Sequence, residues 1–158
     1  MTVSFPHNAT DIVHYRFPEL LPNNQTVALN RQFAHGSGSI TLLEIKDNSP
    51  YVLYNTSVTP AEMSILWVIF EAFPYYAPYE MLHASATYGS LTEERVARSK
   101  QKLADANDYM LWDQEMRPVR NVLSRARAKV RPCGLDIVSI LETGYILKAY
   151  HRREGRRV

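Results

Sequence analysis

The residues best suited to bind a ligand lie in "RPVRNVLSRARAKVRPCG", which runs from Arg117 to Gly134. This segment contains five Arg, one Lys and no Asp or Glu. A helix turns by about 100° per residue, so the apolar residues of the segment form one stripe along it. The residues of that stripe are Val119, Leu123, Ala126 and Val130. The sequence therefore predicts a basic helix over about residues 117–131 that buries one side and exposes cations.

Duplex DNA is a natural ligand for such a helix, because an α-helix fits the major groove. Arg can pair bidentately with guanine and Asn with adenine, whereas other cations hold phosphates without reading sequence. The opposite face of the helix carries Arg117, Asn121, Ser124, Arg125 and Ala128. The residues predicted to face bases are Asn121, Ser124 and Arg125. The residues predicted to hold phosphates are Arg117, Arg120, Arg127, Lys129 and Arg131.

An alternative interpretation needs no ligand. The Arg-rich helix could simply solvate one face, or it could pair with the acidic segment before it. The carboxylates of that segment are Asp105, Asp108, Asp113 and Glu115.

The net charge of +2 conceals an uneven distribution. Residues 1–115 carry 7 Lys and Arg against 13 Asp and Glu, whereas residues 116–158 carry 11 against 3. A basic end on an acidic body is typical of a protein that binds a polyanion. The basic tail, residues 151–158, contributes to this charge.

Enzymatic, metal and membrane functions find little support in the sequence. The five histidines are scattered, with no metal-ligand spacing, and Cys133 is the single cysteine. No phosphate-binding glycine loop is present, and "HGSGS" (His35–Ser39) is interpreted as a linker. The longest apolar run, Met63–Phe70, is shorter than the roughly 18–20 residues of a membrane helix. We expect a soluble cytoplasmic protein that is not an enzyme and has no cofactor or metal.

The elements around the basic helix follow from local signals. Alternating residues predict two short strands within residues 1–38 and a hairpin, Ser39–Asp47 and Tyr51–Val58. Thr59 and Glu62 form a capping box before an apolar helix that should end near Ala72. A second helix should start at Pro78, and a third, polar helix at about residues 90–110 after a capping box of Ser90 and Glu93. A terminal hairpin should turn at Glu142–Gly144.

The polar helix carries apolar residues at intervals of seven: Val96, Leu103 and Met110. Such a narrow seam could pack against a second copy and make a dimer. The alternative is that it folds back over the first helix of its own chain, near Trp67 and Phe70.

The order of hairpin, helix, helix, basic helix and terminal hairpin resembles the OmpR/PhoB-type winged-helix DNA-binding domain over roughly residues 39–150. "VTPAEMSILWVIFEAFPYYAPYEMLHAS" is similar to the start of that domain. "VRNVLSRARAKVRPCGLDIVSILETGYIL" is similar to its recognition helix and wing. The resemblance implies that wing residues contact the DNA backbone, and these would be Thr143, Tyr145 and Lys148.

The chain departs from the family's pattern in three ways. Leu141-Glu142 replaces the usual Arg-Gly before the wing tip. An extra helix stands where relatives carry a short loop that can touch RNA polymerase. Only about 38 residues precede the hairpin, so a phosphorylatable receiver domain is not expected; these residues would complete an N-terminal sheet or form a dimerisation arm.

We therefore expect an α+β protein: a winged helix-turn-helix with an N-terminal antiparallel sheet, three to four helices and a C-terminal hairpin wing. Its function would be sequence-specific binding of double-stranded DNA in transcription regulation, as a homodimer. RNA polymerase is a further partner that the resemblance implies. The alternative is a winged-helix module that binds a protein or RNA without duplex sequence specificity.

Overall fold

The computed structural model describes residues 3–6, 10–32 and 38–151, and it has an α+β fold. Five strands come first: β1 (Val3–Pro6), β2 (Thr10–Tyr15), β3 (Gln25–Gln32), β4 (Gly38–Lys46) and β5 (Ser49–Val58). The remaining elements are α1 (Pro60–Ala72), β6 (Ala77–Pro78), α2 (Tyr79–Tyr88), α3 (Glu93–Asp108), α4 (Trp112–Val130), the 3₁₀ turn η1 (Arg131–Cys133), β7 (Leu135–Ile140) and β8 (Gly144–Ala149). Most of the expected linker and of the basic tail, residues 33–37 and 152–158, lies outside the described residues.

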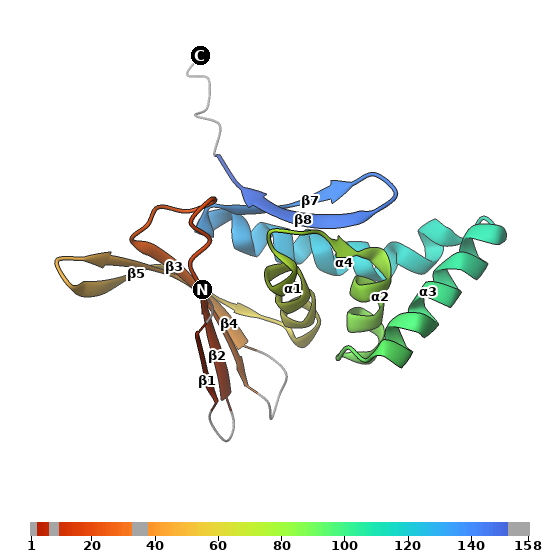
Figure 1. The fold of residues 1–158 in the computed structure, drawn as a ribbon, viewed down its shortest axis with the longest axis horizontal. Helices are drawn as coiled ribbons and strands as arrows, with labels where there is room; N and C mark the ends of the chain where they lie inside the picture. The colour runs from red at the N-terminus through yellow and green to blue at the C-terminus, as the bar shows by residue number, and fades with distance from the viewer. Residues whose placement is uncertain (1–2, 7–9, 33–37, 152–158) are drawn as a thin grey trace, which may run out of the picture.

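The strands form two antiparallel sheets. The larger sheet has five strands in the order β1-β2-β3-β4-β5, and the smaller has three in the order β6-β8-β7. Figure 1 shows α1, α2 and α4 between the larger sheet and α3, with the β7–β8 hairpin running along α4. Of the two strands predicted within residues 1–38, β3 pairs with β4 and β2 pairs with β3, so both extend the sheet of the predicted hairpin.

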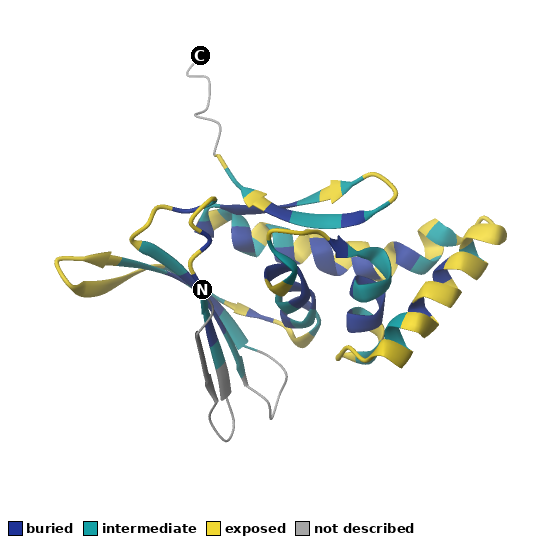
Figure 2. Ribbon diagram, viewed as in Figure 1, coloured by how far each residue is buried: buried dark blue, intermediate teal, exposed yellow. Residues whose placement is uncertain are grey.

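The core joins one face of the larger sheet to the helices. Alternate residues of β3 and β4 point inward, and α1 is apolar on most of its circumference, so it is buried on several sides (Figure 2). The fully buried residues of this contact include Leu29, Ile40, Met63, Leu66 and Phe70. Each such side chain contributes about 1.5–3 kcal/mol by leaving water.

The helix starts show how far local signals determine the fold. Thr59 and Glu62 form the expected capping box, and α1 ends at Ala72 as predicted. The capping prediction for α3 was wrong by two residues: Thr92 caps this helix by accepting a hydrogen bond from the Arg95 amide. Ser90 does not serve as the cap, because α3 begins only at Glu93.

The basic helix is longer than predicted. It begins at Trp112, not near Arg117, and ends at Val130. Pro118 lies inside it and removes one backbone donor, yet the helix continues because buried side chains on both sides of the proline hold it against the core. Met116 and Val119 are both buried.

The hairpin of β7 and β8 is held to the helices by the two-residue strand β6. Pro78 pairs with Gly144 and Ala77 with Tyr145. The backbone approach is so close that a Cβ atom on Gly144 would lie 2.1 Å from the Ala77 carbonyl oxygen. Glycine is therefore required at position 144 for space, and the pairing fixes the hairpin beside α4.

Candidate nucleic-acid interface

The exposed face of α4 is the one that the sequence predicted. Its buried side comprises Met116, Val119, Val122, Leu123, Ala126 and Val130, which includes the whole predicted apolar stripe. The opposite residues are all exposed: Arg117, Asn121, Ser124, Arg125 and Ala128. The three residues predicted to face bases therefore stand together on an open surface.

The two cations on this open face differ from the others. Arg117 and Arg125 are exposed, and neither forms an ion pair with a carboxylate in the described part of the chain. Ala128 lies one turn beyond Ser124. Its side chain is small, so it does not block access to Arg125. A planar guanidinium in this position can present two parallel N–H donors to one ligand edge.

Arg127 and Arg131, both predicted phosphate contacts, converge on one carboxylate. Arg127 donates to the two Asp136 oxygens at 2.7 and 3.1 Å, and Arg131 donates to Asp136 Oδ1 at 3.3 Å. Burial opposes ionisation of Asp136, but these hydrogen bonds outweigh it and hold its pKa below the ordinary value. The same contact with Asp136 raises the pKa of Arg127. These cations hold the end of α4 to β7.

Lys129, a third predicted phosphate contact, pairs with the capping glutamate of α1. Its Nζ lies 2.5 Å from Glu62 Oε1, and the Glu62 side chain is 1% exposed. The same oxygen accepts from the Thr59 amide at 2.9 Å. Burial would raise the pKa of Glu62, but the bonds from Lys129 and Thr59 lower it below the ordinary value. Lys129 therefore supports the α1–α4 contact.

Arg120 pairs with the acidic segment before the basic helix, as the interpretation without a ligand expected for some of the cations. Its guanidinium forms an ion pair with Asp113 at 3.1 Å and lies 5.1 Å from the centre of the Trp112 ring. Asp113 belongs to the acidic segment that the sequence offered as an internal partner. Both side chains are well exposed, so water screens the pair, and Arg120 can still reach an outside anion.

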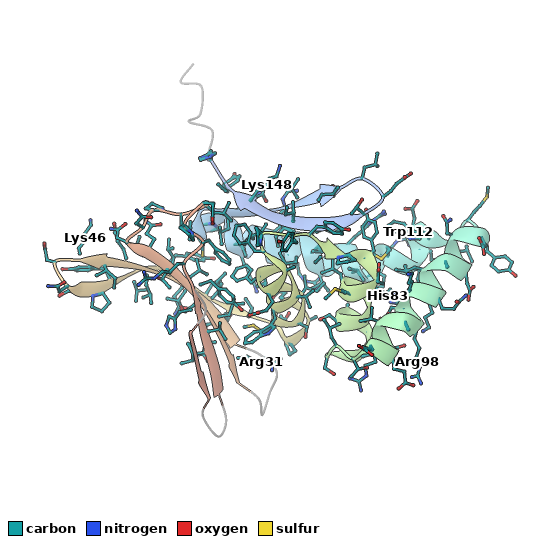
Figure 3. The ribbon with its side chains drawn as sticks, viewed as in Figure 1. Arg31, Lys46, His83, Arg98, Trp112 and Lys148 are labelled. Atoms are coloured by element: carbon teal, nitrogen blue, oxygen red, sulfur yellow. The ribbon has the colours of Figure 1, made fainter. Side chains whose placement is uncertain are left out.

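The three predicted wing residues occupy different environments on the β7–β8 hairpin. The Thr143 hydroxyl donates to the Leu141 carbonyl at 3.0 Å, within the turn. The Tyr145 ring is half-buried and packs edge-on against Tyr79 at 6.0 Å. Lys148 is exposed on β8 (Figure 3), so it is the wing residue most open to a ligand.

The turn of the hairpin carries no cation. Leu141 is 87% exposed, and Glu142 is exposed beside it with a positive φ of 57°. The family that the sequence resembles has Arg-Gly where this chain has Leu141-Glu142. The turn therefore presents a carboxylate, which repels phosphate, in place of a cation.

A polar cluster that the sequence analysis missed connects three helices; two of its members, His83 and Ser99, are buried, and the third, Glu115, is partly exposed. His83 of α2, which is labelled in Figure 3, lies 2.8 Å from Ser99 Oγ through Nδ1 and 2.9 Å from Glu115 Oε1 through Nε2. This order of groups resembles a nucleophile, base and acid, but Ser99 is 0% exposed, so no substrate can reach its hydroxyl. The cluster joins α2, α3 and α4. The one sequence signal for this cluster is Ser99, a small polar residue within the helix α3.

The seam predicted on α3 is not continuous. Leu103 is buried against the protein's own helices, whereas Met110 lies beyond the helix end, has a φ of 59° and is 94% exposed. The helix packs on α2 and α4. The alternative that this helix folds back on its own chain is therefore correct. The expected packing partner was wrong, because α3 packs on α2 and α4 and not on α1 near Trp67 and Phe70.

Other chemistry finds no assembled site in the described part of the chain. No group of three or more His, Cys, Asp or Glu side chains there could hold a metal ion. Burial raises the pKa of the Cys133 thiol to about 12, which makes it a poor nucleophile. None of the helices in the described ranges combines the length and apolar character that crossing a bilayer requires.

Comparison with known proteins adds no relative. Neither a family model, nor a curated protein, nor a solved structure matches the chain.

Proposed function

We propose that the protein is a winged helix of the OmpR/PhoB type that binds double-stranded DNA and regulates transcription, with α4 in the major groove. The observation that carries this proposal is the exposed face of α4, on which Asn121, Ser124 and Arg125 stand clear of any intramolecular ion pair in the described residues. The order of α1, α2, α4 and the β7–β8 hairpin supports the winged-helix assignment.

The residues of this surface fall into three groups: base contacts, phosphate contacts, and cations that hold α4 against the rest of the protein. Arg125 and Asn121 can make bidentate contacts to base edges, and each good contact discriminates by about 1–3 kcal/mol against a wrong base. Arg117, Arg120 and Lys148 are exposed cations that can contact phosphates. Arg127, Lys129 and Arg131 remain predicted phosphate contacts, but their first task is to hold α4 in position.

A protein-binding or RNA-binding module is the second candidate. It is favoured by the carboxylates that engage the cations of α4 and by Glu142 at the hairpin turn, both of which reduce attraction to a duplex. The two candidates differ in one measurable property, because only the first requires preference for a duplex sequence.

Selection from random duplexes, followed by binding measurements, tests the proposal. Arg125→Ala should reduce affinity for the selected site by about 5–150-fold and affinity for a scrambled site far less, because it removes a base contact worth about 1–3 kcal/mol. Lys100→Ala, which removes an exposed cation from α3, is the matched control. An unenriched selection, or equal losses on both duplexes for Arg125→Ala, would contradict the proposed function.

A further inference from the structure

A pocket of about 420 Å³ lies between α1 and α2, with Arg31 of β3 and the residues that follow α2 at its sides. A volume of roughly 300–1,000 Å³ and a mostly apolar lining are typical of small-molecule sites. No residue of α4 lines this pocket, so it is separate from the proposed DNA surface. Its apolar lining consists of Trp67, Val68, Ala72, Met81 and Leu91.

The interior of the pocket favours an apolar group. Two serines line it, but the Ser64 hydroxyl donates to the Pro60 carbonyl and the Ser85 hydroxyl to the Ser64 carbonyl, each at 3.0 Å. Both hydroxyl hydrogens are therefore engaged within the protein. An apolar cavity of about 150 Å³ is enough to hold benzene. This pocket accordingly has room for an aromatic ring and a short polar group, and the Met81 thioether can contact the ring edge.

Two opposite charges flank the apolar lining. The Arg31 guanidinium, labelled in Figure 3, lies 5.0 Å from the centre of the Trp67 ring. A guanidinium has five N–H donors, so Arg31 can bind a ligand carboxylate in addition to its contacts within the protein.

Glu71 supplies the negative charge, one helical turn beyond Trp67 on α1. It is exposed, and its Oε1 accepts from the Tyr15 hydroxyl at 2.5 Å. Among the described residues no Lys, Arg or His pairs with Glu71. A ligand with a single charge meets one like charge at this pocket, whereas a zwitterion is attracted by both Arg31 and Glu71.

We propose that this pocket binds a free amino acid with an aromatic side chain. The ligand carboxylate binds Arg31, in the bidentate geometry that guanidinium favours, and the ligand ammonium binds Glu71. The aromatic ring lies among Val68, Met81 and Leu91. The proposal goes beyond the proposed DNA binding and does not depend on it.

Isothermal titration calorimetry of the full chain with L-phenylalanine tests the proposal without DNA. For a ligand with so few atoms, we expect a dissociation constant of about 0.1–1 mM. Two analogues each lack one charge: 3-phenylpropionate has no ammonium, and phenethylamine has no carboxylate. Each should bind about tenfold or more weakly, because a hydrogen bond to a charged group is lost. This comparison uses the wild-type chain, so it does not depend on the stability of any variant.

Glu71→Gln assigns the ammonium contact. The glutamine keeps an oxygen that can accept from the Tyr15 hydroxyl, so the variant should fold. It should weaken L-phenylalanine binding by about tenfold and leave 3-phenylpropionate binding no weaker. Glu142→Gln, the same change at the exposed hairpin turn, is the matched control and should alter neither. Nuclear Overhauser effects between the ligand ring and the Met81 methyl group should place the ligand in this pocket.

Four results would overturn the proposal. The first is no binding of L-phenylalanine up to about 10 mM, well above the expected dissociation constant. The second is equal affinity for L-phenylalanine and for either singly charged analogue. The third is a Glu71→Gln variant that binds L-phenylalanine as the wild type does, or that weakens both ligands equally. The fourth is a bound ligand whose ring shows no contact with Met81.

Discussion

The ion pair between Lys129 and Glu62 makes a prediction that separates folding from DNA contact. If Lys129 only held phosphate, Lys129→Ala would leave the free energy of unfolding almost unchanged. In the structure its Nζ lies 2.5 Å from a carboxylate that is 1% exposed, and the second oxygen, Glu62 Oε2, has no hydrogen-bond partner in the described residues. Lys129→Ala therefore leaves a buried charge with only the Thr59 contacts.

The expected loss can be bounded from this geometry. Removing one partner of a fully buried pair costs about 3–5 kcal/mol. The Lys129 side chain is 27% exposed, so some of the interaction is screened, and we expect a loss of about 2–3 kcal/mol at neutral pH. For a domain of this size the melting temperature would fall by roughly 4–12 °C.

The pH dependence of this loss has a definite sign. Because the pKa of Glu62 is lowered in the folded protein, its stabilising contribution is present above the unfolded pKa of about 4.3 and disappears as the pH falls through the lower folded value. The difference between wild type and Lys129→Ala should therefore be largest near neutral pH and shrink in acid.

Urea unfolding at several pH values measures these quantities. Glu62→Gln removes the carboxylate charge, so Lys129→Ala should cost much less in that background. Lys148→Ala, which removes an exposed cation from β8, should change stability by less than about 0.5 kcal/mol. A loss below about 0.5 kcal/mol for Lys129→Ala, or the same loss with Gln at position 62, would refute the reasoning.

Two further predictions concern contacts that fix the elements around α4. His83→Ala should lower the free energy of unfolding by about 2–4 kcal/mol, because it opens a cavity and leaves the Ser99 hydroxyl unsatisfied. Hydrogen exchange should then show weaker protection of the α3 amides. Unchanged protection would mean that the cluster does not hold this helix. Gly144→Ala should lower the free energy of unfolding by about 1–3 kcal/mol, because the new Cβ would lie 2.1 Å from the Ala77 carbonyl oxygen. Urea unfolding indistinguishable from that of the wild type would exclude the close β6–β8 pairing.

The sequence predicted the elements whose signals are local. Thr59, Pro60 and Glu62 lie within four residues of one another, so the start of α1 could be recognised without any tertiary information. The buried stripe of α4 was equally accessible, because its period follows from the helix itself. The start of α4 was misjudged because Pro118 resembles a helix boundary, and only contacts with the core show that the helix continues through it.

The pairing of the cations could not be predicted in the same way. Lys129 and Glu62 are 67 residues apart, and Arg127 meets Asp136 only because β7 turns back along α4. Nothing local distinguishes Arg125, which faces solvent, from Arg127, which is bound to a carboxylate two positions along the same helix. The helical period can say which residues leave the core, but whether an exposed cation is available to a ligand depends on the acids that the fold brings beside it. For α4, the cations without a carboxylate partner in the described residues are Arg117 and Arg125, and Arg125 is one of the proposed base contacts.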